Sequence, residues 1–468
     1  MTLSAARPRL GTPPRASRAS AFRDPNGADP ALMTRRAWWL AVLHVLVTGS
    51  AQALAGNRRL GRFALGVWLV GLLAVLLAAG LLLVLPQVPL TIPTNAVGLT
   101  VLQGLVLAWA VLWIGLTLDT LRLVRLVTLR PGSRIAVAAL LVVALVAGTG
   151  GAVQAAVLAG QAKDALGSLF AGTRYALPAD GRYNILLLGG DAGPGRSGLR
   201  PDSISVVSVD ALTGHMVMFG LPRDLDGMPF AAGSPMLKAY PHGYGWHDTC
   251  NVDVCQLNSI YTEVQLKSPQ LYPDAKAQHT LPGIEATKEA VEGSLGIPIQ
   301  YSVLVDMSAF GKLIDAMGGV TIDVKQRLPI GGGVDANGNP TGVKVWIEKG
   351  VQHMNGNRAM WYARSRHGIG NSDYARMGRQ RELETAMLHQ MNPVTLLTRL
   401  EAIGKAGSAA VTTDIPQGLL GELAGVALKA RGQKTTTIEF VPPRVPDPSN
   451  PDSAAIRATV RTALASAG

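Results

Sequence analysis

The pattern of hydrophobic positions along the chain changes character near residue 160. Before that point three long stretches, 63–85, 97–118 and 135–159, contain no charged residue. Each has the roughly 20 apolar residues that a membrane-spanning helix needs. A fourth stretch, 37–56, is weaker because polar side chains and a glycine interrupt it. We expect this stretch to be re-entrant, with a fourth span as the alternative, so that 35–160 forms a membrane region.

After residue 181 short apolar runs alternate with stretches of helical periodicity. The runs typical of strands are 184–188, 203–209, 215–219, 301–305, 320–324 and 436–441. The stretches that indicate helices are 284–295, 308–317 and 373–391. Mixed order of this kind predicts an α/β sandwich in which helices pack on a mixed central sheet. We assign 181–392 to this folded domain and 393–468 to a C-terminal extension of the same domain.

Charge divides the chain at the same place. The 468 residues are 48% hydrophobic and only 16% charged, with a net charge of +12. The charged fraction is below the roughly 25% of an ordinary soluble domain. Residues 1–159 hold 14 arginines, no lysine and three aspartates, a net charge of +11, so the rest of the chain is almost neutral at +1. A basic protein suggests nucleic acid or a membrane as partner, and this distribution favours the lipid bilayer and excludes nucleic acid.

The arginines also predict the orientation in the membrane. They gather in the segments before the first predicted span and between the second and third, whereas the loop between the first and second has no charge. Basic loops stay in the cytoplasm. We therefore expect a multi-pass protein of the cell membrane with an extracytoplasmic C-terminal domain. Residues 1–34, rich in Pro, Arg, Ala and Ser, are expected to be a disordered cytoplasmic tail.

The only two cysteines, Cys250 and Cys255, lie in the predicted extracytoplasmic domain. Disulfides persist in such oxidising surroundings, so we expect a local disulfide between them. The alternative is a metal site with His242, His247 and Asp248, but the spacing matches no standard zinc site.

Arginine and aspartate carry the candidate chemistry of this domain. They follow or precede the predicted strands and begin the helix 373–391, where open α/β sheets place ligands. The carboxylates are Asp191, Asp202, Asp224 and Asp373, and the arginines are Arg200, Arg223, Arg364, Arg366 and Arg376, with Gln380 one turn beyond the last. Guanidinium groups suit phosphate oxygens, and paired carboxylates suit a hard divalent cation. The alternative is an ordinary network of surface ion pairs.

These residues lie in motifs that resemble the LytR–CpsA–Psr family of bacterial cell-envelope proteins. The similar blocks, in the family's order, are Asn184-Ile-Leu-Leu-Leu-Gly-Gly-Asp191, Arg200-Pro-Asp202, Leu221-Pro-Arg-Asp224, Leu257-Asn258 before Tyr261, Gly318-Gly-Val-Thr-Ile-Asp-Val324, Tyr362-Ala-Arg-Ser-Arg366 and Arg376 with Arg379-Gln380. They cover roughly 181–392. The several membrane spans and the Arg-rich tail are similar to those of actinobacterial members.

The resemblance implies a membrane-anchored phosphotransferase that moves a glycopolymer from a polyprenyl-pyrophosphate carrier to peptidoglycan, leaving a phosphodiester link. It implies that Asp191 and Asp202 hold Mg²⁺, or Mn²⁺ in its place. Arg223, Arg364 and Arg366 would act on the pyrophosphate as catalytic residues. Arg200, Arg376 and Gln380 would complete its binding site, and apolar faces beside it would form a slot for the lipid.

One departure and several alternatives remain. The family commonly has a lysine before its Leu-Asn block, where this chain has Gln256, so Lys238 is a candidate for that role. The candidates for the general base are Asp373 and Asp224, and the alternative for each is that it orients an arginine. A polyprenyl-pyrophosphate hydrolase would use the same side chains with water as the nucleophile. A non-catalytic membrane receptor or regulator is the third possibility. The polymer, the acceptor sugar and the oligomeric state are not evident from the sequence.

Overall fold

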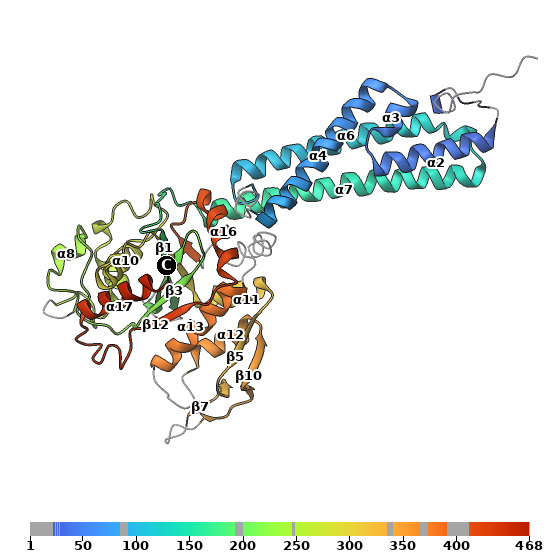
Figure 1. Cartoon of the computed structure of the whole chain (residues 1–468). Helices are drawn as coiled ribbons and strands as arrows, with labels where there is room; N and C mark the ends of the chain where they lie inside the picture. The colour runs from blue at the N-terminus through green and yellow to red at the C-terminus, as the bar shows by residue number, and fades with distance from the viewer. Residues whose placement is uncertain are drawn as a thin grey trace, which may run out of the picture. The chain divides into compact units, whose positions relative to one another are not determined.

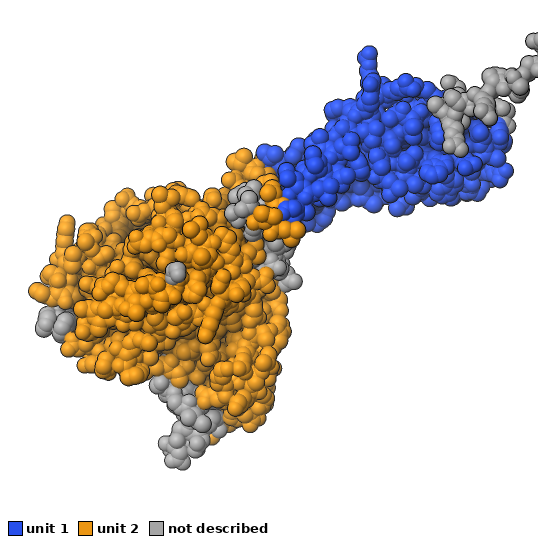
Figure 2. All heavy atoms as spheres, in the orientation of Figure 1, with its two compact units in different colours: residues 1–80, 101–158 blue, residues 81–100, 159–468 orange. Residues whose placement is uncertain are grey.

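The computed structural model describes residues 22–23, 25, 27, 29–84, 92–191, 200–245, 249–334, 340–365, 373–390 and 411–467. The chain divides into two compact units, which Figure 2 shows in different colours. The first comprises residues 1–80 and 101–158, and the second comprises residues 81–100 and 159–468.

The first unit is built from helices. The helices of the N-terminal region are α2 (Pro30–Leu46), α3 (Ser50–Ala55), α4 (Arg58–Val84), α6 (Ala96–Val124), the short 3-10 helix η1 (Leu126–Thr128) and α7 (Pro131–Leu169). Among the described residues, three segments are long and apolar enough to cross a membrane: α4, α6 with η1, and α7. They cover the three predicted spans, apart from residue 85, which lies outside the described part of the chain.

The α2–α3 hairpin packs along α6. Near its start, the Arg36 guanidinium donates to the carbonyl oxygen of Leu123, 2.9 Å away. After its end, Gly56 lies so close to Leu123 that an added Cβ would be 2.9 Å from that side chain. Between these points the His44 imidazole hydrogen-bonds the Thr117 hydroxyl at 2.9 Å. The hairpin therefore begins and ends at one level of α6 and turns about two helical turns away. Its re-entrant placement in a membrane stays a prediction.

A six-stranded mixed sheet organises the second unit. Its order is β11-β4-β1-β2-β3-β12; β1 runs parallel to β4 and β3 parallel to β12, and the other neighbouring pairs are antiparallel. These strands are β1 (Arg182–Asp191), β2 (Arg200–Asp210), β3 (Met216–Leu221), β4 (Tyr301–Asp306), β11 (Val411–Thr413) and β12 (Thr436–Glu439). The remaining strands form two-stranded ladders: β5 (Val320–Val324) with β10 (Gly350–Met354), β6 (Leu328–Ile330) with β9 (Val345–Ile347), and β7 (Gly333–Val334) with β8 (Pro340–Thr341).

Helices cover both faces of the central sheet (Figure 1). The helices of this unit are α8 (Pro235–Ala239), α9 (Leu257–Lys267), η2 (Pro269–Leu271), α10 (Pro282–Leu295), α11 (Met307–Met317), α12 (Gly356–Arg364), α13 (Asp373–Gln390), η3 (Gln417–Leu419), α16 (Leu420–Ala430) and α17 (Ser453–Ala465). Alternate side chains of a strand point to opposite faces. On β1, Leu186 and Leu188 pack with α9, α10 and α17, whereas Ile185 and Leu187 pack with α16.

A separate core joins α11, α12 and α13 to the β5–β10 ladder, with Val320, Tyr362 and Leu383 among its buried members. The second unit is thus a layered α/β domain with a mixed sheet, as the order of apolar runs and helices predicts. Its extension after residue 393 is integral to the sheet, because β11 and β12 form the two edges.

Candidate active site

An apolar cavity of about 290 Å³ lies between the central sheet and helices α11 and α13. Strands β1, β2 and β4 provide one wall through residues such as Ile185, Val207 and Val303, while Phe310 and Leu383 provide the other. Its lining is almost entirely hydrophobic, so the cavity suits an apolar chain and disfavours a charged group.

One part of the cavity lining adjoins the predicted phosphate-binding residues. Gly189, Ser203, Ala363 and Gln380 line it together. Gly189 lies two residues before Asp191, while Ser203 follows Asp202 and Ala363 precedes Arg364. The ends of β1 and α12, the start of β2 and the helix α13 therefore meet here, and they carry most of the predicted phosphate-binding residues.

Asp202 and Arg223 are in direct contact next to this part of the lining. Their carboxylate oxygen and guanidinium nitrogen are 2.5 Å apart, and both side chains are about one quarter exposed. Asp202 lies on β2, where the pairing with β1 is irregular between Gly189 and Gly190. The irregularity brings Asp191 opposite Arg200 at the end of the ladder. A partly exposed ion pair of this kind can exchange its partners for phosphate oxygens at a smaller desolvation cost than a buried pair.

The start of α9 fixes the backbone around Arg223. The backbone amide of Asn258 donates to the Arg223 carbonyl oxygen at 3.1 Å. The backbone amide of Leu257 donates to the Leu225 carbonyl oxygen at 2.9 Å. Gln256, at the position where the family commonly has lysine, is the N-cap residue of α9. The Leu257-Asn258 block therefore positions the loop that carries the arginine.

Two helices supply the remaining described side chains. Arg364 ends α12 and is exposed, whereas Arg376 and Gln380 on α13 are only 6% and 7% exposed. The Oε1 atom of Gln380 is buried and accepts no hydrogen bond from a described residue. Because a buried acceptor without a donor is costly, this amide has capacity for a ligand in the cavity.

Three predicted site residues lie wholly or partly outside the described part of the chain. Arg366 lies outside the described residues, and the side chains of Asp191 and Asp373 do so as well. In the described part of the chain no group of three or more His, Cys, Asp and Glu side chains could hold a metal ion. The roles of these three residues stay predictions.

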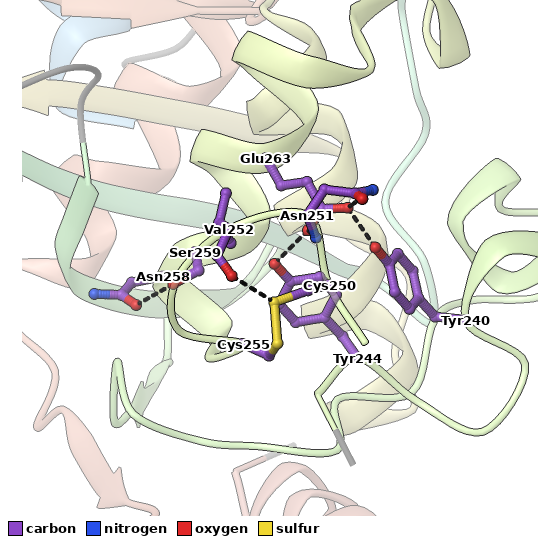
Figure 3. The surroundings of a disulfide bond; sticks show 9 residues. All are labelled: Tyr240, Tyr244, Cys250, Asn251, Val252, Cys255, Asn258, Ser259 and Glu263. Carbon is purple, nitrogen blue, oxygen red and sulfur yellow. Dashed lines mark hydrogen bonds between the residues drawn. A yellow bond between two sulfur atoms is a disulfide. The ribbon is translucent and has the colours of Figure 1, made fainter. Parts of the chain in front are cut away.

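The predicted disulfide joins Cys250 and Cys255 (Figure 3). The loop that it closes places Asn251 against the buried carboxylate of Glu263, which accepts from the Asn251 amide at 3.2 Å. The hydroxyl of Tyr244 donates to the same carboxylate at 2.7 Å, and Tyr240 donates to its other oxygen.

Arg200 lies near this cluster. Burial, followed by the hydrogen bond to Glu263, raises the pKa of Tyr244, and the charge of Arg200 acts in the opposite direction. The phenol therefore stays protonated and keeps donating to Glu263. The disulfide loop and Tyr244 thus both contact the carboxylate of Glu263.

Two residues of α13, the half-buried Glu384 and the buried Arg379, have contacts that the sequence did not predict. Glu384 lines the apolar cavity and accepts from the hydroxyls of Ser203 and Ser205, each at 2.9 Å. Arg379 donates to the carbonyl oxygen of Ser365, between Arg364 and Arg366, and burial lowers its pKa. Their spacing along the helix could have indicated them. Glu384 lies four residues after Gln380, and Arg379 lies three residues after Arg376, so each pair shares a face of α13.

Comparison with known proteins identifies relatives over this domain. The chain is 27% identical to the polyisoprenyl-teichoic acid–peptidoglycan teichoic acid transferase TagV of Bacillus subtilis (strain 168) over 237 residues, which is 50% of each chain. It is 27% identical to the regulatory protein MsrR of Staphylococcus aureus (strain COL), over 56% of this chain and 65% of MsrR. The match thus spans about half to two thirds of the length of these curated relatives.

Solved structures are also similar. The crystal structure of B. subtilis TagV is 23% identical, with a TM-score of 0.42, and the match covers 62% of this chain and 97% of that one. The structure of TagT bound to LI-WTA is 19% identical, with a TM-score of 0.40, and the match covers 63% of this chain and 94% of TagT. The family model described as the LytR_cpsA_psr family matches residues 156–450, more than half of the chain. The chain therefore belongs to the LytR–CpsA–Psr family.

Proposed function

We propose that this protein transfers a glycopolymer from a polyprenyl-pyrophosphate carrier to peptidoglycan and leaves a phosphodiester link. The observation that carries the proposal is an apolar cavity whose lining residues Ser203 and Ala363 are directly next in sequence to Asp202 and Arg364. A polyprenyl pyrophosphate has matching parts, an apolar chain and an anionic head. The names of TagV, a teichoic acid transferase, and of TagT bound to LI-WTA support this choice of substrate class.

The cavity would bind the carrier lipid next to its pyrophosphate. Ile185, Val303 and Leu383 would contact the apolar chain, and Gln380 would lie where the chain meets the head group. Removing this chain from water favours binding by about 25 cal/mol for each Å² buried. The cavity therefore positions the pyrophosphate next to the predicted phosphate-binding residues.

Arginines would bind and stabilise the charge that develops on the phosphate oxygens. Arg223, Arg364 and Arg366 are the proposed catalytic residues, with Arg200 and Arg376 completing the phosphate site. The acceptor hydroxyl oxygen forms a bond to the phosphorus that carries the glycan, and the bridging P–O bond of the pyrophosphate breaks. Polyprenyl phosphate leaves, and the hydroxyl proton passes to a carboxylate, for which Asp373 and Asp224 are the candidates.

Asp191 and Asp202 are the proposed holders of Mg²⁺. They end β1 and begin β2 on paired strands, and two carboxylates together with phosphate oxygens are a donor set that a hard cation accepts. Bound there, the ion would neutralise charge on the pyrophosphate. Asp202 would then divide its interactions between the metal and Arg223, with which it forms an ion pair.

The three apolar helices would anchor the protein in the cell membrane as a multi-pass protein. Arginine-rich segments before α4 and between α6 and α7 favour a cytoplasmic location for both, which places the domain after α7 outside. In this orientation the catalytic domain is on the same side of the membrane as peptidoglycan.

Arg364→Ala tests the proposed site, because this exposed residue at a helix end can be replaced without opening the core. We expect a fall of about tenfold to a hundredfold in transfer, the effect of losing one charge-assisted contact to phosphate. The assay uses the full-length protein, a lipid-linked glycan with radiolabelled sugar, Mg²⁺ and peptidoglycan fragments. Arg461→Ala, an exposed arginine on α17, is the matched control.

Full transfer by the Arg364→Ala variant would show that the assigned site is wrong. Release of labelled sugar phosphate by the wild-type protein, without coupling to peptidoglycan, would favour the hydrolase. Turnover of neither kind would favour a receptor or regulator.

A further inference from the structure

A polar groove lies on the side of α13 opposite the apolar cavity. It consists of two hollows, of about 470 Å³ and 190 Å³, which share Lys325, Gly378 and Glu382. The larger is bounded by β5, α13 and β12, and the smaller extends to Tyr362 and Arg379. We call the two hollows together the α13 groove. None of the described residues that line it also lines the apolar cavity.

The α13 groove reaches the phosphate-binding residues from two directions. At one end Arg379 donates to the Ser365 carbonyl oxygen, next to Arg364. At the other end Glu439 of β12 pairs with Gly220, three residues before Arg223. The two are so close that a Cβ on Gly220 would lie 2.1 Å from a Glu439 carboxylate oxygen. A ligand in the groove would therefore lie beside the pyrophosphate site.

The α13 groove has equal numbers of acidic and basic side chains, and some of them already form ion pairs. Lys325 contacts Asp323, and Arg381 forms an ion pair with Glu384 at 2.5 Å. Three carboxylates and three cationic groups line the two hollows. This balance gives an anionic polymer or a phosphate no net attraction.

Hydrogen-bonding capacity in the groove is incomplete. Both carboxylate oxygens of Glu439 are buried and accept no hydrogen bond from a described residue. The Nε donor of Arg379 is also without an acceptor among the described residues, and this side chain belongs to a residue only 8% exposed. Because unmet buried groups are costly, they favour a ligand that offers several donors and acceptors without net charge. Hydroxyl groups of a sugar have that chemistry.

We propose that the α13 groove binds the sugar of the acceptor glycan. The inference rests on the proposed transfer function and adds the place of the second substrate. The carrier lipid lies on one face of α13 and the acceptor sugar on the other. The acceptor hydroxyl reaches the phosphorus past the first turns of this helix, where Arg376 and Arg379 lie.

Gly378→Leu tests the proposal by filling the groove. No atom lies within 4 Å of a Cβ added at Gly378, and leucine favours a helix more than glycine does. In full-length protein in nanodiscs, we expect the KM for a short soluble peptidoglycan glycan to rise about tenfold or more, as steric blocking predicts. Binding of the lipid-linked donor and its slow hydrolysis by water stay within about twofold of wild type, since no donor contact is changed.

Gly418→Leu is the matched control, because Gly418 is exposed, also has no atom within 4 Å of an added Cβ, and lines neither hollow. Thr437→Phe narrows the groove from the exposed edge strand β12 and repeats the test if Gly378→Leu unfolds. Unchanged acceptor KM in both groove variants overturns the proposal. Equal loss of donor binding and transfer also overturns it, since the groove would then belong to the donor. If the wild-type protein couples no acceptor, the proposed function itself fails, and a direct titration with the glycan still decides whether the groove binds sugar.

Discussion

Arg381 shows how single residues hold the site together. Its side chain is 2% exposed, donates to the Ile204 carbonyl oxygen at 3.0 Å and pairs with Glu384 on its own helix. Glu439 lies on another side, 3.6 Å from the Arg381 Nε atom. Because α13, β2 and β12 meet at one buried cation, removing it would leave carboxylates uncompensated, which commonly costs about 3–5 kcal/mol. Arg381 lines the α13 groove, whereas its partner Glu384 lines the apolar cavity.

Glu439→Gln is expected to change the dependence of stability on pH. Burial raises the pKa of Glu439 in the folded protein, with Arg381 opposing the shift. The protonated form is therefore favoured in the folded state, and its stability contribution is complete below the unfolded pKa of about 4.3. That contribution is lost as the pH rises through the higher folded pKa.

The neutral amide cannot lose a proton, so the variant should be more stable than wild type near neutral pH and should lose this advantage towards pH 4. Thermal unfolding between about pH 4 and pH 8 measures the difference. A constant difference in Tm across that range would contradict the assignment.

At the scale of elements, the α2–α3 hairpin is distinguished by polar contacts within the membrane region. The Gln52 amide donates to Thr120 at 3.0 Å and to the Leu116 carbonyl oxygen at 2.9 Å. Such contacts satisfy polar groups that hydrocarbon cannot. These hydrogen bonds hold the hairpin against α6.

Cysteine labelling tests the re-entrant geometry. Arg35→Cys places a thiol near the start of α2, and Arg58→Cys places one just after α3, both at exposed positions. We expect both to react with a membrane-impermeant maleimide in inside-out vesicles and neither in intact spheroplasts, because a re-entrant segment returns to the side that it entered. Labelling of the two cysteines from opposite sides would instead establish a fourth span.

Many of these helices and strands could be predicted from sequence patterns. The run 184–188 is continuous and apolar because β1 is buried on both faces, and 373–391 shows helical spacing because α13 packs one face in a core. The edge strand β11, with three residues, is too short to produce a pattern. Among site residues, the ion pair of Arg223 with Asp202 follows from strand pairing, but Arg379 and Glu384 are defined by contacts with distant segments. The spacing of residues along α13 does not determine which elements pack against each face.

At the scale of the whole molecule, the C-terminal segment of the chain is an essential part of the fold of the second unit. The last 58 residues, 411–468, contain both edge strands of the central sheet and the helix α17 that packs in its core. Phe440 and Val460 in this part are fully buried. Residues 1–21 belong to the basic stretch that the sequence predicts to be a cytoplasmic tail.

Deletion of 411–468 should therefore abolish cooperative unfolding of the second unit, whereas deletion of 1–21 should leave its Tm unchanged. Removing paired edge strands exposes the backbone and the apolar face beneath them. Near-ultraviolet circular dichroism and calorimetry of the two purified variants measure both outcomes. A cooperative transition in the chain that ends at residue 410 would contradict the integral role of the extension.

The position of β11 and β12 at opposite edges has a consequence for biogenesis. In the proposed orientation, β1 to β4 leave the membrane before either outer strand has been exported. During that interval the growing domain presents two open edges in the envelope, each able to pair with another chain. Completion of translocation, rather than collapse of the first strands, would then set the moment at which the domain becomes resistant to proteases. A chain stalled in the exporter before residue 411 would be recognisable to quality-control proteases by those edges.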